Sequence, residues 1–100
     1  MTTLKEAIVN ASKSTVAPEF RKRLKKLSPQ VQAATQVKYF RWRKDYHTLN
    51  FEPKFSNIYA VEVNNDIHAL AEITGTVVRW TWIGNYKDYT HRLDLLRKGT

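Results

Sequence analysis

The sequence contains no cysteine, which excludes disulfide-stabilised folds and thiolate metal sites. It has only three glycines and three prolines, and no low-complexity segment or internal repeat is visible. No apolar run approaches the roughly 18 residues of a membrane span, and the first residues, MTTLKEAIVNASK, lack the apolar core of a signal peptide. We therefore expect a single cytoplasmic globular domain over residues 1–100, with no membrane partner.

Acidic residues are scarce in one half of the chain. Residues 1–50 hold 11 of the 17 lysines and arginines but only 3 of the 9 acidic residues, so the whole net charge of +8 lies there. A one-sided basic surface attracts polyanions, so nucleic acid is the natural partner. The alternatives are an acidic protein partner, or a helix face whose charge only aids solubility.

Residues 18–46 predict a helical hairpin. Pro18 suits the first position of a helix, and Ser28 with Pro29 ends that helix and starts a second one of about four turns. Apolar residues recur at helical spacing on the first helix, at Phe20, Leu24 and Leu27. On the second helix, the residues expected to face inward are Val31, Ala34, Val37 and Phe40. Residues 1–17 precede the hairpin as an extension, in which TLKEAIVNAS suits a helix or a strand, and we favour a helix.

From residue 49 the apolar period changes from about 3.6 to 2, which predicts four antiparallel strands over about residues 49–83. The side chains expected on one face of the last strand, as anchors against the hairpin, are Val78, Trp80 and Trp82. Trp42 suits either the core or an exposed stacking surface. Residues 86–97 predict a short helix. The predicted fold class is therefore α+β, with an N-terminal helical hairpin packed on a four-stranded antiparallel sheet and a short C-terminal helix.

Three stretches carry a resemblance to a known family: LNFE at 49–52, VEVNNDIHAL at 61–70 and WTWIGNYKDY at 80–89. Together with the order of helices and strands, they resemble the RelE/ParE toxin superfamily of bacterial type II toxin–antitoxin systems over about residues 18–97. Relatives commonly read Trp-x-Trp-Ile-Gly-Ser-His-x-x-Tyr in the last stretch. The matching residues here are Trp80, Trp82, Ile83, Gly84 and Tyr89. The resemblance implies a RelE-like fold and a cognate antitoxin as partner.

Two branches of this superfamily imply different targets. RelE-type members imply a ribosome-dependent, metal-free mRNA endonuclease that inhibits translation, with the ribosome and mRNA as partners and no cofactor. ParE-type members imply inhibition of DNA gyrase or of another protein target. A non-catalytic nucleic-acid-binding module on the same fold is the third alternative. The three histidines, at 47, 68 and 91, have no recognised metal-ligand spacing, so we expect no metal.

Cleavage of RNA without a metal needs a base for the ribose 2′-OH, cations for the phosphorane and an acid for the 5′-oxygen that leaves. Glu52 or His68 is the predicted base. Lys54 and Arg79 are the predicted phosphate cations, and both also suit ordinary strand charges. The predicted acid or stacking groups are Tyr86, Tyr89 and His91. The predicted RNA-binding residues on the hairpin are Arg21, Lys22, Lys25, Lys26, Arg41, Arg43 and Lys44.

Two residues depart from the family at positions that the family uses catalytically. His68 stands where relatives often have arginine, and Tyr86 stands where they often have histidine. An imidazole is largely neutral near pH 7 and lacks the bidentate fork of a guanidinium, whereas tyrosine still donates a proton and stacks. The sequence is therefore compatible with a slow nuclease, with reassigned roles or with an inactive site.

Overall fold

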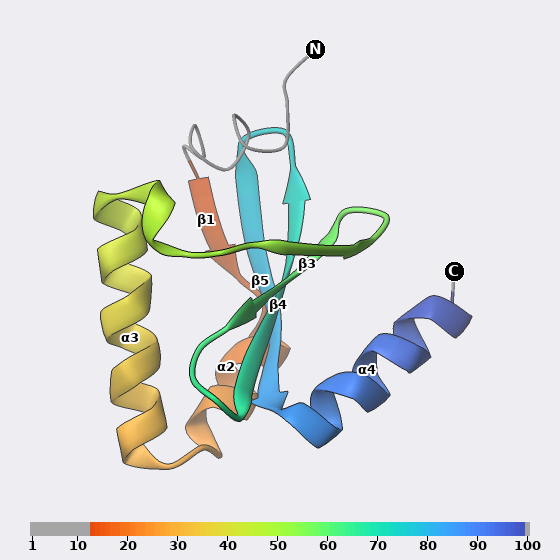
Figure 1. The fold of residues 1–100 in the computed structure, drawn as a ribbon, viewed down its shortest axis with the longest axis horizontal. Coiled ribbons are helices and arrows are strands. Elements are labelled where there is room, and N and C mark those ends of the chain that lie inside the picture. Colours follow the sequence, from red (N-terminus) through yellow and green to blue (C-terminus); the bar gives the residue numbers. More distant parts are fainter. Residues whose placement is uncertain (1–12, 100) are drawn as a thin grey trace.

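The computed structural model describes residues 13–99, which form an α+β fold of one five-stranded mixed sheet and three α-helices (Figure 1). The strands are β1 (Lys13–Val16), β2 (Glu52–Phe55), β3 (Ile58–Glu62), β4 (Ile67–Thr74) and β5 (Val77–Asn85). The α-helices are α2 (Pro18–Lys25), α3 (Pro29–Lys44) and α4 (Tyr86–Lys98), and a 3₁₀ turn, η1 (Tyr46–Thr48), follows α3. The predicted α+β class is confirmed. Over these residues, no helix combines the length and the apolar character that crossing a membrane requires.

The strand order is β1-β5-β4-β3-β2, so the predicted four-stranded antiparallel sheet is wrong by one strand. Residues 13–16 of the N-terminal extension pair in parallel with β5, whereas all other neighbours are antiparallel. The partner of Lys13 is Val77, 64 residues further along the chain. A parallel pairing at that separation leaves no local turn signal, which is why the strand was not predicted. The stretch TLKEAIVNAS, for which we favoured a helix, lies outside the described residues.

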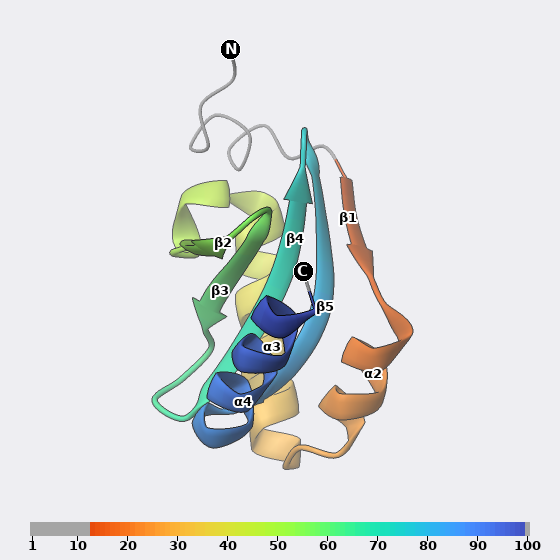
Figure 2. The same cartoon turned by 90° about the vertical axis from the view of Figure 1, so that its right-hand side faces the viewer.

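The two N-terminal helices are confirmed as elements, but they do not pack against each other as the predicted hairpin. Figure 2 shows α2 beside the β5 edge and α3 on the side of the sheet away from α4. Both helices are held by the sheet instead. Phe20 of α2 and Trp42 of α3 each pack on Trp80 of β5, with ring centroids 6.3 and 5.6 Å apart. The two helices therefore pack on Trp80 of the sheet and not on each other.

Only part of the inward face predicted for α3 is correct: Val31 packs against the core as predicted, but Val37 and Phe40 do not. Val37 and Phe40 are 54% and 62% exposed, whereas Trp42 is fully buried. Val31 and Tyr39 pack against the core with Trp42. Because the large Trp42 side chain sets the rotation of the helix, the residues three and eleven positions before it turn inward with it. Trp42 therefore belongs to the core, and α3 carries a second apolar stripe that faces outward.

A β-bulge in β5 separates the two tryptophans that were predicted to share a face. Leu70 of β4 lies opposite Trp82 and Ala71 lies opposite Trp80, so Thr81 has no residue opposite it. Trp80 consequently packs in the core cluster under α2 and α3, and Trp82 packs in a second cluster under α4. The prediction of a shared face is wrong because the alternation of a strand shifts at a bulge.

Candidate functional site

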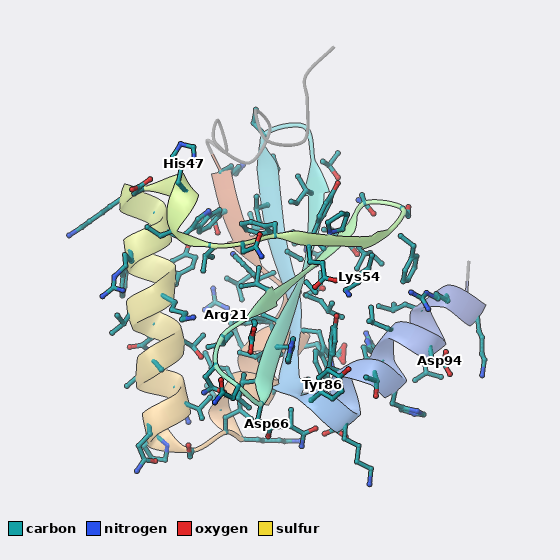
Figure 3. All side chains as sticks on the ribbon, in the orientation of Figure 1. Arg21, His47, Lys54, Asp66, Tyr86 and Asp94 are labelled. Atoms are coloured by element: carbon teal, nitrogen blue, oxygen red, sulfur yellow. The ribbon has the colours of Figure 1, made fainter. Side chains whose placement is uncertain are left out.

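Four of the predicted site residues converge on the face of the sheet that α4 partly covers. Lys54 comes from β2, His68 from β4, and Tyr86 and Tyr89 from the start of α4. The His68 ring stacks on Tyr89 with 4.6 Å between ring centroids and 14° between planes, and Tyr86 meets His68 edge-on at 5.4 Å. Figure 3 shows Lys54 and Tyr86 on the same side of the sheet, next to α4. We call these four residues the site cluster.

The end of β5 determines where the two tyrosines lie. Gly84 is opposite His68 in the sheet, so the end of β5, from which α4 starts, is fixed beside the imidazole. A Cβ on Gly84 would lie 2.6 Å from the Trp82 ring, so any larger residue would push that ring away. Asn85 then caps α4 through its side chain. Because the two tyrosines are three residues apart on the helix, they share the face that meets His68.

Lys54 is a fixed cation at the edge of the cluster. Its Nζ lies 2.8 Å from Glu52 Oε1, and its side chain is only 19% exposed. The hydrogen bond to Glu52 raises the pKa of Lys54 above its ordinary value of 10.5, with a further contribution from Tyr89 and an opposing one from burial. Lys54 is therefore charged throughout the neutral range. Glu52, the alternative predicted base, serves as its ion-pair partner.

His68 is held by ring contacts, and its Nδ1 has no hydrogen-bond partner in the described part of the chain. Its Nδ1 is buried, and it makes no hydrogen bond to any residue between 13 and 99. Buried ring nitrogens normally have a partner, but the His68 ring is held in place by its contacts with the two tyrosine rings and not by a hydrogen bond from Nδ1. Over the same residues, no group of three His, Asp or Glu side chains is arranged to hold a metal ion.

Comparison with known proteins was informative only at the level of structure. No protein-family model matches the sequence, and no curated protein sequence matches it. A chain of the RelB-RelE antitoxin-toxin complex from Methanococcus jannaschii superposes with a TM-score of 0.67 at 13% identity, over 78% of this chain and 96% of that one. A chain of the toxin-antitoxin complex RelBE2 from Mycobacterium tuberculosis superposes with a TM-score of 0.60 at 16% identity, over 73% of this chain and 88% of that one. YafQ from E. coli superposes with a TM-score of 0.58 at 16% identity, over 76% of this chain and 94% of that one.

These three structures share one architecture at low sequence identity, so they establish the fold of this chain. The chain has a RelE-like fold. The resemblance seen in the short sequence motifs is thereby confirmed at the level of structure. The structure differs from the predicted arrangement in its mixed sheet, with β1 at the edge, and in α2 and α3, which do not pack as a hairpin.

Two predicted residues on this RelE-like fold lie away from the site cluster. Arg79 is exposed on β5 opposite Glu72, which follows His68 by four residues along β4. That spacing corresponds to about 13 Å along a strand, on the same face of the sheet. His91 is exposed on α4, two residues after Tyr89, and so it points to the far side of that helix. The roles of both residues stay predictions.

The predicted RNA-binding residues occupy two separate helices of the RelE-like fold. The exposed members are Arg21, Lys22 and Lys25 on α2, Lys26 at its C-cap, and Arg41 and Lys44 on α3. Arg43 is half-buried, and its guanidinium lies 5.5 Å from the Trp42 ring centroid. Because α3 and the site cluster lie on opposite faces of the sheet, these cations surround the fold and do not line the cluster. Their RNA-binding role stays a prediction.

Sequence reasoning did not single out Arg23 of α2. The Arg23 Nε donates to the Ile83 carbonyl at 2.7 Å, and the guanidinium lies over the Trp82 ring at 4.5 Å. A guanidinium nitrogen also lies 3.7 Å from Asp88 in the first turn of α4. Arg23 thus caps the open edge of β5 and ties α2 to α4. The only sequence feature that could have indicated these contacts is the position of Arg23 beside the apolar face of α2 that includes Phe20.

Proposed function

We propose that this protein is the toxin of a type II toxin–antitoxin system and that it cleaves mRNA on the ribosome without a metal. The observation that carries this proposal is the site cluster on a RelE-like fold. A fixed cation, an imidazole and two phenols meet on a face that α4 only partly covers. These are the groups that transfer of a phosphate to the ribose 2′-oxygen requires.

Each member of the cluster has a role in the proposed reaction. His68 takes the proton of the ribose 2′-OH, the 2′-oxygen attacks phosphorus, and the bond from phosphorus to the 5′-oxygen breaks. Tyr86, which is 54% exposed, gives its proton to the departing 5′-oxygen. Lys54 neutralises the charge of the phosphorane, and Tyr89 holds the His68 ring in place by stacking. The products are a 2′,3′-cyclic phosphate and a 5′-hydroxyl. Arg79, further along the same face, binds a neighbouring phosphate.

The proposal is tested with a defined mRNA on the ribosome. We expect the wild-type chain to cut this message, and we expect no cut when the ribose at the cleaved position is 2′-deoxy, because the attacking oxygen is then missing. His68→Ala should lower the rate about 10²–10⁴-fold. Loss of DNA supercoiling without mRNA cleavage would instead favour the gyrase-inhibitor alternative. Neither effect, together with retained RNA binding, would favour the non-catalytic module.

We also propose that a cognate antitoxin covers the groove between α2 and α3. This groove has a volume of about 400 Å³ and an apolar floor that includes Leu24 and Trp80, with Arg21 and Lys38 among its lining residues. Phe40 also lines it and is 62% exposed. An amphipathic segment with acidic residues matches this combination. Two of the similar structures are antitoxin–toxin complexes.

The antitoxin proposal is tested by co-expression with the neighbouring open reading frame. We expect the two products to co-purify, and we expect Phe40→Asp to weaken the complex without unfolding the free chain, because the side chain is exposed. Lys87→Asp, on the exposed start of α4, is the control. Equal binding by both variants would place the antitoxin elsewhere.

A further inference from the structure

A second cavity adjoins the site cluster and shares His68 with it. It has a volume of about 250 Å³, and its polar lining residues are Lys38, Thr48, Asn50, Glu52, Glu62 and His68. A water molecule occupies about 30 Å³ in the liquid, so the cavity holds the volume of about eight waters. That is room for one nucleobase.

The cavity exists because the sheet narrows at this point. The pairing of β2 with β3 begins with Glu52 opposite Ala60, so the end of β3 has no β2 neighbour. Glu62 lies at this unpaired end, opposite His68 of β4. The Lys38 Nζ reaches across from α3 to within 3.5 Å of the Glu62 carbonyl. The end of η1 and the residues that follow it close the remaining side, so four separate parts of the chain form the walls.

The cavity places a hydrogen-bond acceptor, the Glu62 carboxylate, beside a hydrogen-bond donor, the Lys38 ammonium group. Glu52 already has a partner in Lys54, at 2.8 Å. The Glu62 carboxylate is exposed and has no ion pair among residues 13–99. Lys38 carries a positive charge next to it. A ligand for this arrangement offers hydrogen-bond donors to the carboxylate and an acceptor to the ammonium group.

We propose that this cavity binds a guanine base of the RNA, read on its Watson–Crick edge. Guanine carries two adjacent donors, N1–H and the N2 amino group, which match the two oxygens of Glu62, and its O6 accepts from Lys38. Adenine, cytosine and uracil lack two adjacent donors on that edge. Single-stranded RNA is recognised in this way, by hydrogen bonds to splayed bases. This inference rests on the proposed cleavage of RNA at the site cluster, because a base in the cavity brings its own ribose next to His68.

The experiment measures the binding of 5′-GMP, AMP, CMP and UMP to the full chain by the NMR shifts of backbone amides. We expect GMP to bind about tenfold more tightly than the others, with the largest shifts at Glu62 and Lys38, since a bidentate contact discriminates by about this factor or more. Glu62→Gln presents an amide in place of the carboxylate and should remove the preference for GMP in favour of AMP. Asp94→Asn, on the outer side of α4, changes the same charge and should keep the preference for GMP.

Failure of the inference and failure of the proposed function give different results. Equal binding of the four nucleotides, or GMP shifts away from Glu62 and Lys38, overturns the guanine site even if the chain cleaves mRNA. A preference for GMP that Glu62→Gln removes supports the site even if no message is cut. Where cleavage occurs, messages that differ only in the base at the cut should be cleaved about tenfold faster with guanine there, and the Glu62→Gln variant should lose that difference.

Discussion

The face of the sheet toward α3 and the face toward α4 differ in what covers them. The first carries a continuous core in which Trp42, Phe51 and Trp80 contact one another, with ring centroids 5.6 to 5.8 Å apart. The second has a smaller cluster around Leu70, Trp82 and Leu93, because α4 crosses only part of it (Figure 2). The site cluster lies where α4 begins, and it combines two tyrosines of this helix with His68 and Lys54 of the sheet. A small domain thus places most of its stabilising burial on one face and leaves the other free for chemistry.

The strongest test of this division is a substitution in the first face. Trp42→Ala should lower the free energy of unfolding by about 3–5 kcal/mol, because a fully buried indole leaves a cavity. Phe40→Ala, two residues earlier on α3, is the matched control and should change it by less than about 0.5 kcal/mol, because that side chain is 62% exposed. Urea denaturation followed by circular dichroism measures both. Similar losses for the two variants would contradict the inward rotation of α3.

The second test substitutes a residue on the face of the sheet toward α4. Lys54→Met should lower the rate of ribosome-dependent cleavage about 10²–10³-fold, because a preorganised cation is lost where charge develops in the transition state. The stability should change little, since the partner carboxylate of Glu52 is 65% exposed. Lys87→Met, exposed on α4, removes the same charge outside the cluster and should leave the rate near that of the wild type. A rate that is unaffected by Lys54→Met would remove Lys54 from the proposed reaction.

Arg23 contacts both β5 and α4, so its loss should affect both stability and cleavage. We expect the effect to be of intermediate size. Arg23→Ala should cost about 2 kcal/mol of stability, because it removes a charged hydrogen bond to Ile83 and the contact with Trp82. It should also slow cleavage, because α4 carries both tyrosines of the site cluster. Lys87→Ala, which removes an exposed cation of α4 outside the site cluster, is the control. A stability loss with unchanged cleavage would show that α4 keeps its position without this contact.

The elements with local signals were predictable from the sequence. Pro18 and the Ser28-Pro29 pair mark the starts of α2 and α3 within one residue, because proline and a serine cap act on the first turn itself. The strand period of 2 likewise revealed β2 to β5. The bulge at Thr81 and the rotation of α3 were not predictable, because packing against residues far along the chain decides both.

The sequence singled out the four residues of the site cluster, but it did not predict that they lie together. The family motifs singled out His68 and Tyr86. Lys54 was singled out because the proposed reaction needs a cation for the phosphate. That these residues meet, while Arg79 does not join them, depends on the register of β4 with β5 and on where α4 begins. The roles of Arg23 and of the cavity at Glu62 come from contacts among three or more elements, and no spacing in the sequence encodes such contacts.

The smallest expected effect concerns the ion pair that fixes Lys54. Glu52→Gln should move the pKa of Lys54 down toward its ordinary value of 10.5, because the hydrogen bond to Glu52 is the main cause of its rise. A lysine whose pKa is raised by folding stabilises the fold at every pH below its unfolded pKa, and this contribution is lost as the pH rises through the folded pKa. The stability difference between wild type and Glu52→Gln that this lysine causes should therefore be constant from neutral pH to about 10 and shrink only above that. NMR titration of the lysine Cε resonances, with Glu72→Gln as the control on the same face, measures the pKa directly. A Lys54 pKa that is the same with and without Glu52 would show that the pair does not hold the cation of the open face in place.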